Sequence, residues 1–306
     1  MRTRLLALAI VTGLGLATAA PSNAATSRIA VHFDVKKGQQ PENLALAPDG
    51  TAYVTFATAR QVAAVSPSGV IKVLATLPAP ADDGADVPAL GFALTTGIVR
   101  TADGTLYFLY ASGDPATTGL YRLNPGREPR RIAALPANGL PNGLALDVPA
   151  KTFYVTDSAL GTISTVPLKG GPARTWSSAR ELAATGFLGA NGIKVRHGAV
   201  WATNLDQGTL LRIPITHGRP GPVEVRATGL AGIDDIAFAG RRVVATLNAP
   251  NKVVGIDAKG RVATLLTDGL QNPTSVAVRG RTLYVLSAAY LTATDPNLIH
   301  ATLPRD

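Results

Sequence analysis

The stretch Asn142-Gly143-Leu144-Ala145 is one of six short segments in this chain that share a pattern of residue types. Each segment starts with an oxygen-bearing side chain, continues with a small or polar residue, and then enters an apolar run typical of a strand. The six leading residues are Glu42, Thr96, Asn142, Asn191, Asp234 and Thr274. Successive leading residues lie 54, 46, 49, 43 and 40 positions apart, which is close to the repeat length of a β-propeller blade.

Between the leading residues, the sequence reads as short strands broken by turns such as Pro48-Asp49-Gly50 and Pro67-Ser68-Gly69. Only Ser177–Ala184 has helical character. The sixth repeat lacks a fourth strand, whereas Arg28–Val35 precedes the first repeat and alternates like a strand without a partner. We therefore predict an all-β fold, a six-bladed β-propeller closed by this N-terminal strand, which completes the last blade. A pair of β-sandwiches is the alternative, and the persistent repeat length disfavours it.

The first 24 residues are typical of a secretory signal peptide. Two arginines precede the apolar run Leu5–Ala20, and Ser22-Asn23-Ala24 supplies the small residues of a cleavage site. The run is shorter than the ~20 residues of a membrane-spanning helix, so export is favoured over a membrane anchor. No Cys follows that could carry a lipoprotein anchor. We predict a secreted protein with its leader at 1–24, a single propeller domain at 25–306, and no stable membrane insertion.

The composition excludes several classes of site. The chain has no cysteine, which excludes thiolate catalysis, zinc–thiolate sites and iron–sulfur clusters. The net charge is +9, but the basic residues are scattered and aromatic residues make up only 5% of the chain. Nucleic-acid binding, which favours a concentrated basic face with stacking aromatics, is therefore not expected. A closed propeller needs no second subunit, so we expect a monomer that acts on a small molecule.

In a propeller the first strand of each blade is innermost, so the six leading residues should meet at one mouth of the central channel. Calcium binds six to eight oxygen ligands, including carboxylates and amide carbonyls. Glu42, Asn142, Asn191 and Asp234 are therefore the four candidate ligands for Ca²⁺ or another hard divalent cation. The alternative is a hydrated channel without metal, and Asn followed by Gly also suits a turn that enters a strand. Turn chemistry does not account for Glu42 or Asp234.

A resemblance to a known family starts from Leu140–Ala145 and from Tyr154–Ser158 in the next strand. These segments resemble the regucalcin/gluconolactonase (senescence marker protein) family of calcium-dependent six-bladed propellers, to which paraoxonases and squid-type diisopropylfluorophosphatases are related. The metal ligands of these families are a Glu in the first blade, two Asn in middle blades and an Asp in a later blade. By resemblance, those roles fall on the four candidate ligands. The pair Asp234-Asp235 is similar to the Asp-Asn pair of paraoxonases, so Asp235 becomes a candidate for contact with metal or substrate.

The resemblance implies an exported calcium-dependent hydrolase of lactones or related esters, with a metal-activated water in the channel. We expect Asp234 or Asp235 to act as general base or, as a weaker alternative, as nucleophile. Thr96 and Thr274 are expected to line the substrate channel.

The chain departs from the related families in two respects. Thr96 stands where paraoxonases have a His, and the Arg and Asn with which gluconolactonases often grip a sugar lactone have no identifiable equivalents. Two other functions stay open, because one fold hosts many activities. One is a non-catalytic, metal-stabilised binding propeller, and the other is a strictosidine-synthase-like or streptogramin-lyase-like enzyme.

Overall fold

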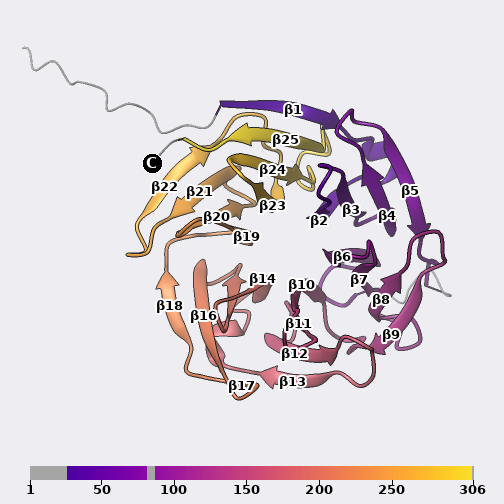
Figure 1. Cartoon of the computed structure of the whole chain (residues 1–306), viewed down its shortest axis with the longest axis vertical. Helices are drawn as coiled ribbons and strands as arrows, with labels where there is room; N and C mark the ends of the chain where they lie inside the picture. Colours follow the sequence, from indigo (N-terminus) through magenta and orange to yellow (C-terminus); the bar gives the residue numbers. More distant parts are fainter. Residues whose placement is uncertain (1–25, 81–86, 305–306) are drawn as a thin grey trace, which may run out of the picture.

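A computed structural model of the chain describes residues 26–80 and 87–304. Figure 1 shows six sheets arranged as a ring around a central axis, in chain order from indigo to yellow. No α-helix occurs in the described residues, so the predicted all-β propeller is confirmed. The predicted leader at 1–24 lies outside the described residues.

Blades 1 to 3 are four-stranded antiparallel sheets whose strands follow one another in chain order. Blade 1 contains β2 (Pro41–Leu46), β3 (Ala52–Phe56), β4 (Gln61–Val65) and β5 (Ile71–Thr76). Blade 2 contains β6 (Leu94–Arg100), β7 (Leu106–Ala111), β8 (Gly119–Leu123) and β9 (Arg130–Ala134). Blade 3 contains β10 (Pro141–Asp147), β11 (Thr152–Asp157), β12 (Thr162–Pro167) and β13 (Arg174–Ser177).

Blades 4 to 6 follow the same plan with two variations, an extra strand in blade 4 and the closing strand in blade 6. Blade 4 contains β14 (Ala190–Arg196), β15 (Ala199–Asn204), β16 (Thr209–Thr216), β17 (Arg219–Pro220) and β18 (Glu224–Ala227). Blade 5 contains β19 (Ile233–Ala239), β20 (Arg242–Leu247), β21 (Lys252–Ile256) and β22 (Val262–Leu266). Blade 6 contains β23 (Pro273–Arg279), β24 (Thr282–Ser287), β25 (Asn297–Thr302) and β1 (Thr26–His32). In Figure 1 the first strands of the blades, β2, β6, β10, β14, β19 and β23, lie nearest the axis.

The ring closes through its two ends, as predicted. Strand β1 pairs antiparallel with β25, from Thr26 opposite Thr302 to His32 opposite Asn297. The strand ends at His32, before the predicted Val35, because a 3₁₀ turn η1 (Val35–Lys37) follows it. The Asp34 side chain accepts a hydrogen bond from the Lys36 backbone N–H and so caps this turn.

The predicted helical segment Ser177–Ala184 contains a single 3₁₀ turn, η2 (Arg180–Leu182). It lies between the last strand of blade 3 and the first strand of blade 4, so it belongs to a connection between blades. The short strand β17 in blade 4 was not predicted. It pairs with the end of β16, which continues beyond the part that pairs with β18.

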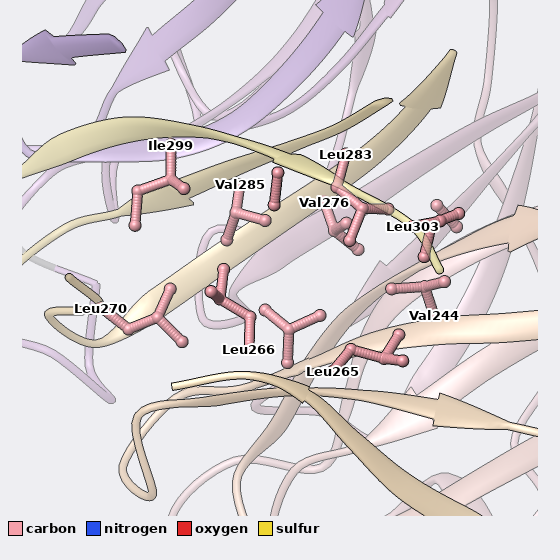
Figure 2. Close-up of a cluster of buried hydrophobic side chains, with 12 residues drawn as sticks. Val244, Leu265, Leu266, Leu270, Val276, Leu283, Val285, Ile299 and Leu303 are labelled. Carbon is pink, nitrogen blue, oxygen red and sulfur yellow. The ribbon is translucent and has the colours of Figure 1, made fainter. Parts of the chain in front are cut away.

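Apolar side chains fill the interfaces between neighbouring blades. Among the described residues, six hydrophobic clusters lie one at each interface around the ring. Figure 2 shows the cluster between blades 5 and 6, where Val244, Leu265 and Leu266 face Val276, Val285 and Ile299. A seventh cluster lies elsewhere, around one mouth of the channel, and contains Leu94, Leu140 and Leu188.

The glycines that follow three leading residues are required by close packing of the blades. A Cβ on Gly97, Gly143 or Gly192 would lie 2.3–2.6 Å from the carbonyl oxygen of the leading residue of the next blade. Real Cβ atoms do not approach that closely, so a side chain at any of the three would push the blades apart. The Asn-Gly pairs therefore lie inside strands β10 and β14, and they do not form entry turns.

Within residues 26–80 and 87–304, no helix is long and apolar enough to cross a membrane.

Candidate functional site

A β-bulge at the start of each innermost strand sets the direction of the leading side chains. The pairing register shifts at this point in all six blades, for example between Pro141 and Leu144 in blade 3 and between Ile233 and Ile236 in blade 5. Bulges re-aim side chains and are common beside active sites. Each shift contains the leading residue, and in blades 2 to 5 also the residue after it.

Four of the six leading side chains come together. Glu42, Asn142, Asn191 and Asp234 all line one cavity of about 390 Å³ at a mouth of the channel. All four residues are buried, with exposed fractions of 3–8%. The structure therefore places the four candidate ligands, from blades 1, 3, 4 and 5, around one space.

Thr96 and Thr274 are placed differently. Their hydroxyls donate to backbone carbonyls of the next blade, Thr96 to Pro141 at 2.8 Å and Thr274 to Pro41 at 2.9 Å. Both residues are buried, and neither lines the cavity. Since these hydroxyls tie blade 2 to blade 3 and blade 6 to blade 1, the predicted substrate-lining role does not fit their positions.

The other four blades make the equivalent bond from a threonine on the second strand. Thr55 and Thr203 donate to the carbonyls of the leading residues Thr96 and Asp234 at 2.7 Å, and Thr246 donates to that of Thr274 at 3.4 Å. Thr156 makes the same contact with the Asn191 carbonyl. In blades 2 and 6 this position on the second strand is Leu109 or Leu286. Where the threonine that bridges to the next blade lies on the second strand, the leading side chain is free to face the cavity.

Two residues missed by sequence reasoning hold the carboxylates. The Tyr290 hydroxyl donates to Glu42 Oε2 at 2.6 Å, and Asn248 Nδ2 donates to Asp234 Oδ2 at 3.2 Å. Both also line the cavity. Asn248 follows β20 directly, at the end of the blade nearest the cavity. This position in the sequence could have identified it as a cavity residue. Tyr290 lies in the loop between β24 and β25, and no spacing in the sequence connects it with Glu42, 248 residues away.

The two carboxylates lie in an environment that disfavours their charge. Burial raises the pKa of Glu42 to about 7. The hydrogen bond from Tyr290 lowers this pKa in part, and the charge of Asp235 raises it further. Burial, together with repulsion from Glu42 and Asp235, raises the pKa of Asp234 well above its ordinary value. Burial and the neighbouring Glu42 charge also raise the pKa of the Tyr290 phenol well above its usual value. No Lys, Arg or His is among the described residues that line this cavity.

Asp235 lies outside this group. Its carboxylate accepts hydrogen bonds from Lys194 Nζ at 2.5 Å and from Ser275 Oγ at 2.6 Å, and its side chain is 2% exposed. Lys194 lines a second depression of about 400 Å³, which is formed by later residues of the innermost strands and therefore lies at the opposite mouth. The pairing of Asp234 with Asp235 as two catalytic candidates is thus not supported by their positions, since only Asp234 reaches the cavity.

The donor set of the cavity fits a hard cation. Within the described part of the chain, Glu42 Oε1 and Asp234 Oδ1 accept no hydrogen bond, and the buried Asn191 side chain makes none. Asn142 uses its Nδ2 to donate to Ser158 Oγ at 3.1 Å, which leaves its oxygen available. Two carboxylate and two amide oxygens are ligands that Ca²⁺ accepts, with water completing the shell. Among the described residues there is no group of three or more His, Cys, Asp or Glu that could hold a metal, so any metal here depends on the amides.

Comparisons with known proteins identify similar folds. No family model matches the chain, and no curated protein sequence matches it. A calcium-binding protein, regucalcin, from Agrobacterium tumefaciens is 16% identical with a TM-score of 0.65, over 87% of this chain and 92% of that one. A gluconolactonase from Xanthomonas campestris is 14% identical with a TM-score of 0.65, over 94% and 99% of the two chains.

A further similar structure is a catalytically inactive His-to-Ala variant of virginiamycin B lyase from Staphylococcus aureus with quinupristin. It is 18% identical with a TM-score of 0.62, over 87% of this chain and 82% of that one. The chain shares the propeller fold of all three. At these identities the similarity establishes the fold alone.

Proposed function

We propose that the protein is a calcium-dependent hydrolase of lactones or related esters. The observation that carries the proposal is the burial of Glu42 and Asp234, from different blades, in one cavity with Asn142 and Asn191 and without a basic side chain among its described lining residues. Buried carboxylates without a counter-charge are costly unless they bind a cation. The names of two similar structures, a calcium-binding regucalcin and a gluconolactonase, support the calcium and lactone parts of the proposal.

Glu42, Asn142, Asn191 and Asp234 would hold the metal. When bound, calcium acts as a Lewis acid toward a carbonyl oxygen and orients water. Asp234 would accept the proton of the attacking water, while Asn248 holds its Oδ2 in place. Water adds to the ester carbonyl, the carbon–oxygen bond of the leaving alkoxide breaks, and the alkoxide takes up a proton, so that a lactone yields a hydroxy acid.

The direct test combines metal analysis with a panel of lactones and esters. Hydrolysis is expected to stop in excess chelator, return with calcium, and be lost in Asp234→Ala while the circular dichroism spectrum stays unchanged. Asp257→Ala is the matched control, because Asp257 belongs to the same blade and its carboxylate bonds Arg261 on the exposed surface. Turnover that survives both the chelator and Asp234→Ala would contradict the proposal.

The non-catalytic alternative makes a distinct prediction. A metal-stabilised binding propeller would gain thermal stability with calcium and show no turnover on the whole panel.

An elimination reaction is the second candidate, favoured by the fold similarity to a virginiamycin B lyase. In that protein a His-to-Ala variant is inactive, whereas here none of the four histidines lines the cavity. A base such as Asp234 would have to take the histidine's place. Reaction in ¹⁸O-water separates the two chemistries, because hydrolysis adds one water oxygen to the product and elimination adds none.

We also propose that the chain is exported after cleavage behind Ala24 and works as a monomer. N-terminal sequencing of the secreted protein should start at Ala25, and light scattering should give the mass of one chain. A cell-retained, uncleaved protein or a dimer mass would contradict these proposals.

A further inference from the structure

The cavity above the candidate site has a polar floor and apolar walls. The carboxylates and amides lie at the starts of the innermost strands, whereas the walls come from the connections between strands and from Leu94 at the start of β6. The apolar wall residues are Leu90, Phe92, Leu94, Leu140, Phe187, Leu188, Leu205 and Leu291. Most of them belong to the seventh hydrophobic cluster, which joins side chains of several blades. This cluster does not fill an interface between two blades, so its exposed side is available to a ligand.

Two large apolar side chains extend this wall into solvent. Phe187 is 56% exposed and Leu291 is 74% exposed, and both line the cavity. They come from different blades, Phe187 from the loop before β14 and Leu291 from the loop after β24. Single exposed apolar residues are common on protein surfaces. Two of them at the mouth of an already apolar cavity mark a binding surface.

Hydrogen bonds hold the backbone at both of these residues. The Phe187 N–H donates to Asp206 Oδ2 at 2.8 Å, and the Leu291 N–H donates to Asn272 Oδ1 at 2.8 Å. In the loop that contains Leu291, Ala289 is fully buried with φ of 54°, a left-handed conformation that is unfavourable for alanine. A loop held in a strained conformation that turns Tyr290 to the floor and exposes Leu291 is preorganised for a ligand.

The apolar wall side chains cannot form hydrogen bonds with the hydroxyls of a polyhydroxylated ligand. A site that binds a sugar needs hydrogen-bonding groups around the ring, because hydroxyls buried without partners are costly. Several polar lining groups are already engaged, namely Tyr290 with Glu42, Asn248 with Asp234, Gln40 with the Ala288 carbonyl and Thr58 with the Gly38 carbonyl. A phosphorylated ligand would need a basic side chain, and none lines the described cavity.

We propose that the substrate is a neutral lactone or ester whose non-reacting part is an alkyl or aryl group, and that sugar lactones are poor substrates. This inference rests on the proposed hydrolase function. The ester group faces the polar floor. The apolar part lies against Leu90, Phe92 and Leu140, and its end extends out of the cavity between Phe187 and Leu291. A volume of about 390 Å³ is in the range of small-molecule pockets.

The test uses the whole mature protein with calcium and γ-lactones that carry alkyl chains of increasing length, with glucono-δ-lactone beside them. We expect kcat/KM to rise roughly fourfold per methylene until the cavity is full, which is the fold-change that ~0.8 kcal/mol per buried CH₂ gives. Phe187→Ser and Leu291→Ser should flatten this dependence, with the largest loss of kcat/KM on the longest lactone. Val148→Ser is the matched control, since Val148 is 66% exposed in the β10–β11 turn and lines no part of the cavity.

A second readout separates this inference from the proposed function. Alkyl γ-lactams of the same chain lengths, which are not hydrolysed, are titrated by calorimetry. If glucono-δ-lactone is the best substrate and chain length has no effect, the proposed apolar substrate class is wrong and the proposed hydrolase function is supported. If no lactone is turned over but the lactams bind more tightly with length, the hydrolase falls and the apolar ligand class stands. Absence of both turnover and lactam binding overturns both.

Discussion

Asp234 and Asp235 are adjacent on one strand, both are buried, and their carboxylates face different surroundings. Asp235 is paired with Lys194 from blade 4 and Ser275 from blade 6, so its carboxylate links three consecutive blades. Among the described residues, the Asp234 carboxylate has the amide of Asn248 as its one hydrogen-bond partner, and it faces Glu42, a second carboxylate. The difference separates a carboxylate that stabilises the ring from one that the metal-free fold accommodates poorly. The poorly accommodated carboxylate is the better candidate for function.

The largest loss of stability is expected when the ion pair between Lys194 and Asp235 is broken. Lys194→Met leaves the buried Asp235 without its counter-charge and should lower the free energy of unfolding by about 3–5 kcal/mol. Urea unfolding measures this loss. In an Asp235→Asn background the same substitution should cost much less, because no charge is left to compensate. A cost below about 1 kcal/mol in the wild-type background would mean that Lys194 is not needed at Asp235.

The uncompensated charges should appear as a pH dependence of the calcium-free protein. Burial raises the pKa of Glu42 from 4.5 to about 7, so between these pH values the folded chain binds more protons than the unfolded chain. The free energy of unfolding should therefore fall as pH rises from about 4.5 to about 7, and Glu42 contributes at most ~3.5 kcal/mol of this fall at ~1.4 kcal/mol per pKa unit. Urea unfolding of metal-free protein at several pH values measures the fall. Glu42→Gln should remove most of it, and an unchanged slope in that variant would exclude Glu42 as the cause.

Tyr290→Phe tests whether the hydrogen bond to Glu42 positions a ligand. Groups that orient metal ligands typically change metal affinity 10–100-fold, so calorimetry should show calcium binding weakened by about that factor. Tyr284→Phe is the matched control, because Tyr284 lies in the same blade, is buried and lines no part of the cavity. Tighter calcium binding in Tyr290→Phe would indicate that the phenol competes with the metal for Glu42.

The smallest expected effect is a change in stability that has opposite signs for substitutions at Asp234 and Asp235. Without calcium, Asp234→Asn removes a charge that burial and Glu42 disfavour, so stability should rise by about 1–2 kcal/mol. Asp235→Asn removes a compensated charge and leaves Lys194 without its partner, so stability should fall. Thermal unfolding of both variants in metal-free buffer checks the comparison. Equal losses in both would show that the surroundings of the two carboxylates do not differ in energy.

The repeat pattern was sufficient to predict the ring and the closing strand, because every blade must solve the same packing problem with the same local sequence. It also predicted the six leading positions, since the start of an innermost strand always meets the channel mouth. The division of these positions into four cavity residues and two threonines has a signal in the chain as well. Thr55, Thr156, Thr203 and Thr246 on the second strands mark the blades whose leading side chain is free.

The sequence could not predict the partners of the carboxylates. Tyr290 reaches Glu42 from a loop between strands, and loop conformations depend on local strain and on contacts with other blades. The resemblance to paraoxonases placed Asp234 and Asp235 together, whereas the β-bulge between Ile233 and Ile236 gives their side chains different surroundings.

The sequence by itself therefore determined the propeller, its closure and the oxygen-bearing residues at the channel mouth, because local repetition encodes them. Only the tertiary structure decided which carboxylate lacks a counter-charge, which groups hold it, and that the walls above it are apolar. Those properties depend on residues from different blades, and their distances are set by closure of the whole ring.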